Sequence, residues 1–216
     1  MKTYSENDYT LRFGAPLGRA RAAVILVHGR GASAESIAGL AKLWAGADGL
    51  AFLAPQANGG SWYPQRFLAP LAANEPWLTA ALGRVATLVA EAEAAGVPAE
   101  RIGLAGFSQG ACLVLEHAWR ERRRYGFVAG LSGALIGPLD TPRERVGASL
   151  GGTPVLLGCA ERDAHIPLDH VEHGARVLAD VGAEVTKLIF PGEAHTVFAE
   201  EAEWLRARGL ALLAGA

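Results

Sequence analysis

One serine stands between two glycines at the point where an apolar run meets a helical pattern. Ser108 lies in the stretch 106–110, Gly-Phe-Ser-Gln-Gly, directly after the apolar run Ile102–Phe107. A strand that turns straight into a helix makes a sharp corner, and small flanking residues let neighbouring backbone pack against it. Such a corner presents its side chain at the carboxyl end of the sheet, where open α/β sheets bind ligands. The pattern predicts that Ser108 is a nucleophile for acyl transfer.

The spacing of the glycines is weak support by itself. The chain contains 27 glycines, so a match of this kind arises by chance in some sequences. The alternative interpretation is a tight strand-to-helix turn in which Ser108 only caps the helix. The nucleophile is favoured because the free N–H groups at a helix start suit a developing oxyanion, and because suitable partners follow later in the chain.

A serine nucleophile needs a base, and the base needs an acid that orients it. His195 is the only histidine after the last predicted strand, Val185–Phe190, and is the predicted base. Asp163 lies in the turn after the preceding strand and is the predicted acid. Glu161 is its competitor, and Asp169 is placed too far along, at the start of a helix. The resulting order of serine, acid and histidine is the order found in α/β-hydrolases.

Two backbone N–H groups are predicted to bind the oxyanion. One belongs to Gln109, the residue after the nucleophile, and the other to the loop 28–33, at Arg30 or Gly31. His28 is interpreted as a hydrogen-bonded support beneath this loop. The cation at position 30 suggests the further hypothesis that its side chain favours acyl chains or leaving groups that carry negative charge.

These side chains need a scaffold that brings strand ends together. Apolar runs of strand length recur without polar alternation, as expected for strands buried on both faces, and helical patterns lie between them. This alternation predicts an α/β domain with a mainly parallel sheet. The predicted strands are Val24–Val27, Leu50–Ala54, Ile102–Phe107, Phe127–Leu131, Val155–Leu157 and Val185–Phe190. The predicted helices are Ser33–Leu43, Pro76–Ala95, Gln109–Arg124, Leu168–Val181 and Glu200–Leu213.

The remaining segments suggest sheet edges and long loops. Tyr9–Phe13 and the stretch around Arg19 are predicted as antiparallel edge strands. Gln56–Glu75 and Gly133–Thr153 are irregular, and long loops in compact domains are usually functional or mobile. Neither a linker nor an internal repeat interrupts the pattern, so a single domain over residues 1–216 is expected.

Composition limits the classes of partner. The net charge of -2 gives no electrostatic reason to expect nucleic acid. The polar start of the chain has no apolar core of a secretion signal, and the chain has no apolar run of membrane-spanning length. The two cysteines do not form a disulfide framework. We therefore expect a cytoplasmic protein without stable membrane insertion. Two histidines three residues apart, at 170 and 173, make a poor metal site, so no metal is expected.

Six segments together resemble a known family. LVHGRGAS, GGSWYPQRF, RIGLAGFSQGA, GLSGAL, GCAERDAHIP and PGEAHTVF are similar, in this order, to segments of the phospholipase/carboxylesterase family of α/β hydrolases, which includes the acyl-protein thioesterases. The resemblance implies an α/β-hydrolase fold, with a mainly parallel twisted sheet, helices on both faces and little or no cap domain. It implies a serine hydrolase for small to medium acyl esters or thioesters that needs no cofactor.

The resemblance also implies roles for individual residues. It places the nucleophile, acid and base on Ser108, Asp163 and His195, and the oxyanion donors on Arg30 and Gln109. It places Trp62 near the acyl group. The WYPQRF segment is more similar to bacterial esterases than to the eukaryotic thioesterases. The candidate walls of a substrate pocket are Trp62, Phe67, Ile136 and Ile166; for all except the tryptophan, packing under loops is an equal alternative.

Two other functions compete with the serine esterase. A lactone hydrolase like dienelactone hydrolase is the nearest enzymatic rival, but such enzymes usually have a cysteine nucleophile. A ligand-binding protein without catalysis on the same fold usually lacks one member of the triad. The expected partner is a small-molecule ester or thioester, and a homodimer is compatible with the sequence.

Overall fold

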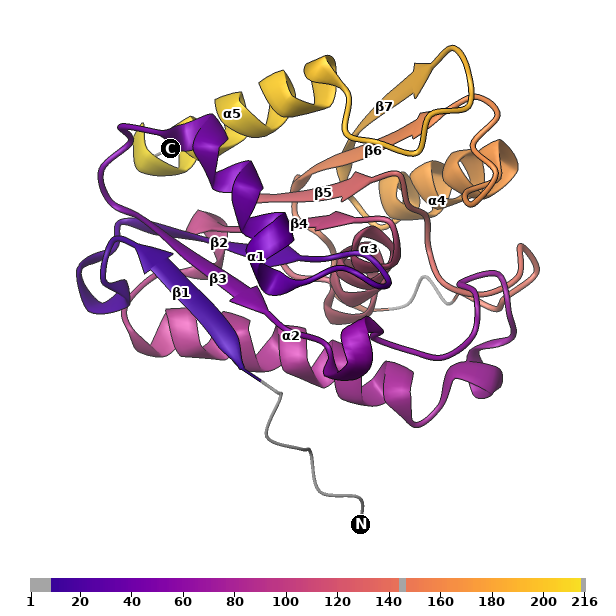
Figure 1. Ribbon diagram of the computed structural model, residues 1–216, viewed down its shortest axis with the longest axis horizontal. Coiled ribbons are helices and arrows are strands. Elements are labelled where there is room, and N and C mark those ends of the chain that lie inside the picture. The colour runs from indigo at the N-terminus through magenta and orange to yellow at the C-terminus, as the bar shows by residue number, and fades with distance from the viewer. Residues whose placement is uncertain (1–8, 144–146, 215–216) are drawn as a thin grey trace.

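Seven strands form one sheet in the computed structural model, which describes residues 9–143 and 147–214 (Figure 1). The strand order is β1-β3-β2-β4-β5-β6-β7. β1 pairs antiparallel with β3, and the other pairings are parallel. The prediction of a mainly parallel α/β sheet is confirmed. The strands are β1 Thr10–Gly14, β2 Ala22–Val27, β3 Leu50–Pro55, β4 Ile102–Phe107, β5 Phe127–Leu131, β6 Pro154–Ala160 and β7 Glu184–Phe190.

Helices cover both faces of this sheet (Figure 1). Helices α2, α3 and α4 pack on one face, and α1 and α5 pack on the other. Successive residues of a strand point to opposite faces, so the apolar residues of β2 alternate between the two core layers. The helices are α1 Ala34–Ala38, α2 Trp77–Ala94, α3 Gln109–Glu121, α4 Leu168–Asp180 and α5 Ala199–Ala214.

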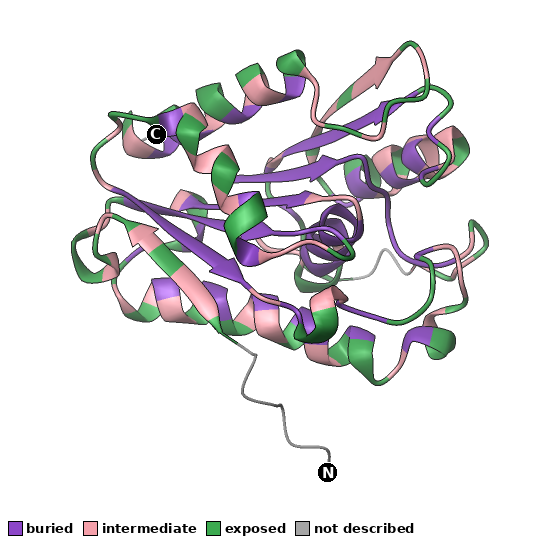
Figure 2. Ribbon diagram, viewed as in Figure 1, coloured by how far each residue is buried: buried purple, intermediate pink, exposed green. Residues whose placement is uncertain are grey.

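Burial follows the position of each strand in the sheet. The central strands β2 to β6 are buried almost throughout, whereas the edge strands β1 and β7 are partly exposed (Figure 2). A strand covered on both faces has no solvent side, which explains why the central strands have no alternating polar residues. The long apolar runs of the sequence therefore identify the centre of the sheet.

Three predicted elements differ from the structure. The stretch around Arg19 is not a strand but a 3-10 turn, Leu17–Arg19, because β1 already occupies that edge of the sheet. The helix predicted over Ser33–Leu43 is α-helical only to Ala38 and continues as a 3-10 helix to Trp44. Helix α3 stops at Glu121, before the predicted end, because Arg122 adopts a left-handed conformation with φ 44°.

Two observations concern the class of the chain as a whole. The polar start that was expected to carry no secretion signal falls mainly on residues 1–8, which lie outside the described residues. Within 9–143 and 147–214, none of the helices combines the length and the apolar character needed to cross a membrane.

Candidate active site

Ser108 lies at a strained corner between β4 and α3. Its backbone has φ 53° and ψ −116°, a conformation that side-chain-bearing residues rarely adopt. A Cβ on Gly106 would come under 3.0 Å from the carbonyl of Gly110, and a Cβ on Gly110 would come equally close to the carbonyl of Val27. Both glycines are therefore needed for the close approach of three backbone segments. The Ser108 N–H donates to the carbonyl of Leu131 at 2.9 Å, which ties the corner to β5.

The loop after β6 and the loop after β7 bring a carboxylate to an imidazole. His195 Nδ1 lies 2.7 Å from Asp163 Oδ2, and the Asp163 side chain is fully buried. Asp163 Oδ1 accepts the backbone N–H groups of His165 at 2.8 Å and Ile166 at 3.2 Å. Burial by itself raises the pKa of Asp163, but the bonds from His195 and the two N–H groups outweigh it and leave this pKa below its ordinary value. The carboxylate is therefore held ionised.

Backbone hydrogen bonds hold these two loops side by side. The Glu161 N–H donates to the carbonyl of Phe190 at 2.7 Å, and the Arg162 N–H donates to the carbonyl of Gly192 at 3.0 Å. The pairing of β6 with β7 thus continues beyond the strands. The Glu161 side chain, the competitor for the acid, is 54% exposed and lies 3.6 Å from Arg162. Asp169 lies in the first turn of α4, so neither alternative carboxylate occupies the place beside His195.

The imidazole of His195 packs close to the corner. Its ring lies 5.0 Å from the ring of Phe107, the residue before Ser108, and 4.8 Å from the ring of His165 on the loop after β6. Its side chain is 22% exposed. Because Nδ1 is bonded to Asp163, Nε2 is the nitrogen left for proton exchange. The contact with the His165 imidazole could not be predicted from the sequence, since only the folded loop brings the two rings together.

Backbone N–H groups from the loop after β2 and from the start of α3 are available beside Ser108. A Cβ on Gly29 would lie 3.3 Å from the Cβ of Ser108, so the loop after β2 packs directly on the corner. The N–H of Gly31 donates to the carbonyl of Gly60 at 2.8 Å, whereas the N–H of Arg30 has no hydrogen-bond partner among the described residues. Gln109 is the first residue of α3, and its N–H has no acceptor within the helix. Of the two predicted alternatives in this loop, Arg30 rather than Gly31 keeps its N–H free.

His28 supports this loop from below. It is fully buried; its Nε2 accepts the N–H of Ala57 at 3.0 Å, and its Nδ1 donates to the carbonyl of Gly29 at 2.7 Å. Burial lowers the pKa of His28, and the bond to Gly29 opposes this only in part. A neutral, doubly bonded imidazole agrees with the interpretation of His28 as a structural residue.

The side chains of Arg30 and Gln109 hold the loop 61–65. The Arg30 guanidinium donates to Ser61 Oγ and to the carbonyls of residues 63, 64 and 65, at 2.6 to 3.0 Å. The Gln109 amide accepts the N–H of Trp62 at 3.0 Å and donates to the carbonyl of Tyr63 at 2.8 Å. The hypothesis that Arg30 selects negatively charged substrates is therefore not supported, because its donors point to loop carbonyls. Neither contact could be found from the sequence, since both join residues more than thirty positions apart.

The candidate pocket walls are buried in the main core. Trp62, Phe67, Ile136 and Ile166 are exposed by 6% or less, and all four belong to the core layer beneath α2, α3 and α4. The indole N–H of Trp62 donates to the carbonyl of His28 at 2.8 Å. The carbonyl of Phe67 accepts the N–H of Gly137 at 2.7 Å, which joins the two long loops. This burial favours the alternative interpretation, in which these side chains pack in the core.

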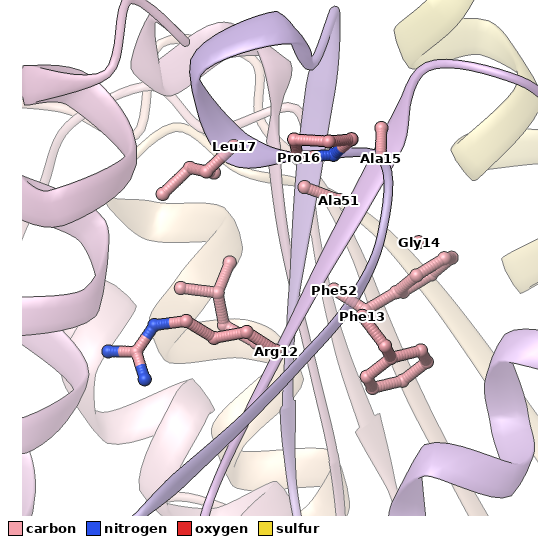
Figure 3. A pocket seen from close by; sticks show the side chains of 9 residues that line it. Arg12, Phe13, Gly14, Ala15, Pro16, Leu17, Ala51 and Phe52 are labelled. Atoms are coloured by element: carbon pink, nitrogen blue, oxygen red, sulfur yellow. The ribbon is translucent and has the colours of Figure 1, made fainter.

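Neither a cavity nor a group of metal ligands forms a second candidate site among the described residues. A cavity of about 160 Å³ opens beside β1 and the start of β3 and includes Phe13, Leu17 and Phe52 (Figure 3). The guanidinium of Arg12 at this cavity is paired with Glu91 at 2.8 Å, so the cavity presents no unpaired charge. Across residues 9–143 and 147–214, His, Cys, Asp and Glu side chains form no group of three or more that could hold a metal ion.

The chain is similar to several known proteins. The sequence model of the phospholipase/carboxylesterase family matches residues 12–207. The crystal structure of a phospholipase/carboxylesterase from Dyadobacter fermentans superposes with a TM-score of 0.89 at 38% identity, covering 96% of this chain and 99% of that chain.

Two curated relatives carry the name acyl-protein thioesterase 1. The protein from Gibberella zeae is 29% identical over 121 residues, which are 52% of this chain and 48% of the relative. The protein from Yarrowia lipolytica is 34% identical over 113 residues, which are 51% of this chain and 49% of the relative. The matches thus span about half the length of each thioesterase.

Proposed function

The chain belongs to the phospholipase/carboxylesterase family, with its α/β-hydrolase fold, and on this premise we propose that it is a serine hydrolase of carboxylic esters. Ser108 is the nucleophile, His195 the general base and Asp163 the acid that orients it. The backbone N–H groups of Arg30 and Gln109 form the oxyanion hole. The substrates are small to medium acyl esters or thioesters, and the reaction needs no cofactor.

One observation carries this proposal. The buried, ionised carboxylate of Asp163 lies 2.7 Å from His195 Nδ1, at the same sheet edge where Ser108 stands on a strained corner. Strain of this kind costs about 1–3 kcal/mol and is concentrated at functional sites. A structural turn would not need a strained serine, an oriented imidazole and two free N–H groups in one place.

The first half-reaction transfers the acyl group to the enzyme. Ser108 Oγ attacks the carbonyl carbon while His195 Nε2 takes the hydroxyl proton, and Asp163 stabilises the imidazolium that forms. The N–H groups of Arg30 and Gln109 donate to the oxyanion of the tetrahedral intermediate. Each such donor typically contributes about 3–4 kcal/mol to lowering the barrier. The C–O or C–S bond then breaks, and the leaving alcohol or thiol takes the proton from His195.

The second half-reaction releases the acid. Water attacks the carbonyl carbon of the acyl-Ser108 ester and gives its proton to His195 Nε2. The same two N–H groups hold the second oxyanion. The bond to Ser108 Oγ breaks, the serine recovers its proton from the imidazolium, and the carboxylic acid leaves. The enzyme returns to its starting state with one water consumed.

The two cysteines favour a serine over a cysteine nucleophile. Burial raises the pKa of Cys112 to about 12 and that of Cys159 to about 12, with the Asp163 carboxylate adding to the effect at Cys159. Both thiols are buried and free, so neither supplies a thiolate near neutral pH. This weakens the alternative of a lactone hydrolase with a cysteine nucleophile.

The surroundings of the protein are part of the same proposal. Two free thiols suit a reducing compartment, so we place the chain in the cytoplasm with a small-molecule ester or thioester as its partner. Joining all seven strands in one sheet supports a single domain over residues 1–216. A homodimer remains compatible with this arrangement.

A substrate series tests the function. We expect the purified protein to hydrolyse p-nitrophenyl esters, with an optimum among the short to medium acyl chains, and an acyl-CoA in the same series measures thioester hydrolysis. A fluorophosphonate probe should label the native chain and not the Ser108→Ala variant. A binding protein without catalysis would take no label, and a lactone hydrolase would turn over a dienelactone faster than any ester in the series. Either result would overturn the proposal.

A further inference from the structure

The loop that carries His195 is held at two further backbone points. Ser132 Oγ donates to the carbonyl of Thr196 at 3.2 Å, and Glu201 Oε2 accepts the N–H of Phe198 at 2.8 Å. These contacts lie one and three residues after His195. The loop is thus fixed from below by two side chains that have no part in the proposed chemistry.

Ser132 is a second strained serine. It follows β5, is fully buried and has φ 50°, in the left-handed region that side-chain-bearing residues avoid. Its N–H donates to the carbonyl of Gly158 in β6 at 2.8 Å. The strained backbone directs the hydroxyl to the His195 loop. A residue kept in such a conformation, where glycine would relieve the strain, indicates that the hydroxyl is needed.

Glu201 is a buried acid in an unfavourable place. It lies in the first turn of α5, is fully buried, and its Oε1 has no hydrogen-bond partner among the described residues. Burial raises the pKa of Glu201 to about 7; the N–H of Phe198 opposes this shift and the charge of Glu200 adds to it. Burying a carboxyl group without full compensation destabilises a fold. The bond from the Phe198 N–H is one half of a capping box, and it accounts for Oε2 but not for Oε1.

Gly158 contacts both Ser132 and Glu201. Its carbonyl accepts the Ser132 N–H, and a Cβ at this position would come under 3.0 Å from the Glu201 carboxyl group. Ser132, Gly158 and Glu201 are therefore a continuous set of buried groups beneath the His195 loop, which we call the buried support. It reaches the loop from β5 on one side and from α5 on the other.

We propose that Ser132 and Glu201 are positioning residues that keep His195 aligned between Asp163 and Ser108. This inference rests on the proposed function, in which His195 is the base. Neither side chain touches the reacting atoms; each acts through the backbone at residues 196 and 198. A displacement of about 1 Å in a reacting group can reduce the rate by about 100-fold, so small shifts of this loop are sufficient to matter.

Three variants and one matched control test the inference. Ser132→Ala removes one tie, Glu201→Leu removes the other, and Glu201→Gln keeps an oxygen for the Phe198 N–H. Thr153→Val is the control. Thr153 is fully buried, and its hydroxyl accepts the N–H of Tyr125 and donates to the carbonyl of Leu150. It lies directly before β6, at the end of the strand away from the Asp163 loop. The measurements are kcat and KM for a p-nitrophenyl ester, the melting temperature, and the downfield proton NMR resonance of the His195–Asp163 hydrogen bond.

The expected pattern separates positioning from general stability. Ser132→Ala and Glu201→Leu should each lower kcat by about 10- to 100-fold with KM nearly unchanged, and should shift or broaden the downfield resonance. Glu201→Gln should recover most of the activity. Thr153→Val, at a similar loss of melting temperature, should keep both kcat and the resonance.

Two results would contradict the positioning role of Ser132 and Glu201. If Ser132→Ala and Glu201→Leu reduce kcat no more than Thr153→Val does, or leave the resonance unchanged, the buried support is only structural. If Glu201→Leu does not fold, Ser132→Ala decides the question by the same measurements. A native chain without ester hydrolysis and without fluorophosphonate labelling would refute the proposed function instead, and the resonance in the variants would still test the positioning.

Discussion

The corners at Ser108 and Ser132 share several backbone features. They end the adjacent parallel strands β4 and β5, with φ of 53° and 50°. Each serine N–H donates to the carbonyl of the next strand, at Leu131 and Gly158, with distances of 2.9 and 2.8 Å. Each serine also has a glycine two residues before it. A serine with positive φ that is tied to the next strand therefore occurs twice, at the ends of two neighbouring strands.

What surrounds the two hydroxyls differs. Ser108 is partly exposed and leads directly into α3, whereas Ser132 is fully buried, leads into an irregular loop and donates to Thr196. Two residues after the serine stands Gly110 in one corner and Ala134 in the other. A strained serine alone therefore does not identify a nucleophile. The element that follows and the access of solvent decide whether the hydroxyl can meet a substrate or supports a neighbouring loop.

Removing each hydroxyl should separate the two corners most strongly. On the proposed mechanism, Ser108→Ala should abolish the covalent step and lower kcat for ester hydrolysis by about a million-fold, the loss seen when a serine protease loses its nucleophile. Ser132→Ala should retain far more activity because no bond forms to that oxygen. Steady-state hydrolysis of a p-nitrophenyl ester measures both. Similar losses in the two variants would remove the distinction between a reacting and a supporting serine.

The next largest effect concerns the acid that serves the exposed corner. Asp163→Asn should lower kcat by about 10,000-fold, because an amide holds the imidazole in the wrong tautomer. Glu161→Gln is the matched control from the same loop, and since its side chain is largely exposed, its kcat should stay near that of the native chain. Comparable losses of kcat from the two substitutions would contradict the choice of Asp163 over Glu161 as the acid.

The buried support of the second corner should appear in the pH dependence of stability. The pKa of Glu201 is about 7 in the folded chain against an ordinary value of 4.5, so the folded state binds the proton more tightly. Its contribution to stability is fully present below pH 4.5 and is lost as the pH rises to about 7. Glu201→Gln cannot titrate.

The free energy of unfolding of Glu201→Gln should therefore rise relative to that of the native chain across this window, by at most about 3 kcal/mol. Urea unfolding of both proteins at several pH values measures the difference. A pH-independent difference would show that Glu201 is not held as a buried acid.

Glycine substitutions should show how the two corners differ in packing. A Cβ on Gly106 meets the backbone of Gly110, whereas a Cβ on Gly130 meets the flexible side chain of Leu115. Gly106→Ala should therefore lower the free energy of unfolding by about 1–3 kcal/mol, and Gly130→Ala by less. Gly83→Ala, on an open face of α2, should be neutral or slightly stabilising. Chemical denaturation ranks the three, and an equal loss at 106 and 130 would contradict the packing argument.

The smallest expected effect concerns the loop beside the exposed corner. Arg30→Leu removes the bonds to the loop 61–65 and should slow the hydrolysis of neutral and carboxylate-bearing esters by a similar factor of about 10. Paired kcat/KM values for two esters of equal length test this. A much larger loss for the carboxylate-bearing ester would restore the role of the Arg30 side chain in recognising substrate charge.

The sequence was sufficient where local spacing reports on geometry. The apolar runs identified the six central and far-edge strands, and the paired glycines predicted the corner at Ser108, because close backbone approach excludes larger residues. The family resemblance of the quoted segments is confirmed by the match over residues 12–207. The roles assigned to Asp163 and His195 remain proposals, although the structure brings their side chains together.

The sequence was insufficient where a side chain depends on distant partners. Ser132 has Ala134 where the corner at Ser108 has its second glycine, and the acceptor of its hydroxyl, the carbonyl of Thr196, lies 64 positions away. The residue three positions before Glu201 is Phe198, so the usual serine or threonine of a capping box is absent. The 3-10 turn at Arg19 depends on β1 occupying the sheet edge. Such tertiary contacts leave no repeating pattern of apolar and polar residues from which they could be predicted.

The hydrogen bonds that continue the β6–β7 pairing limit how the protein can be altered. Because the N–H groups of residues 161 and 162 donate to the carbonyls of residues 190 and 192, an inserted or deleted residue in either segment would move these donors away from their acceptors. Loop grafting intended to widen the substrate range should therefore leave these two segments at their native length. Changes of loop length are better tolerated in segments whose backbone is not hydrogen-bonded to a neighbouring segment.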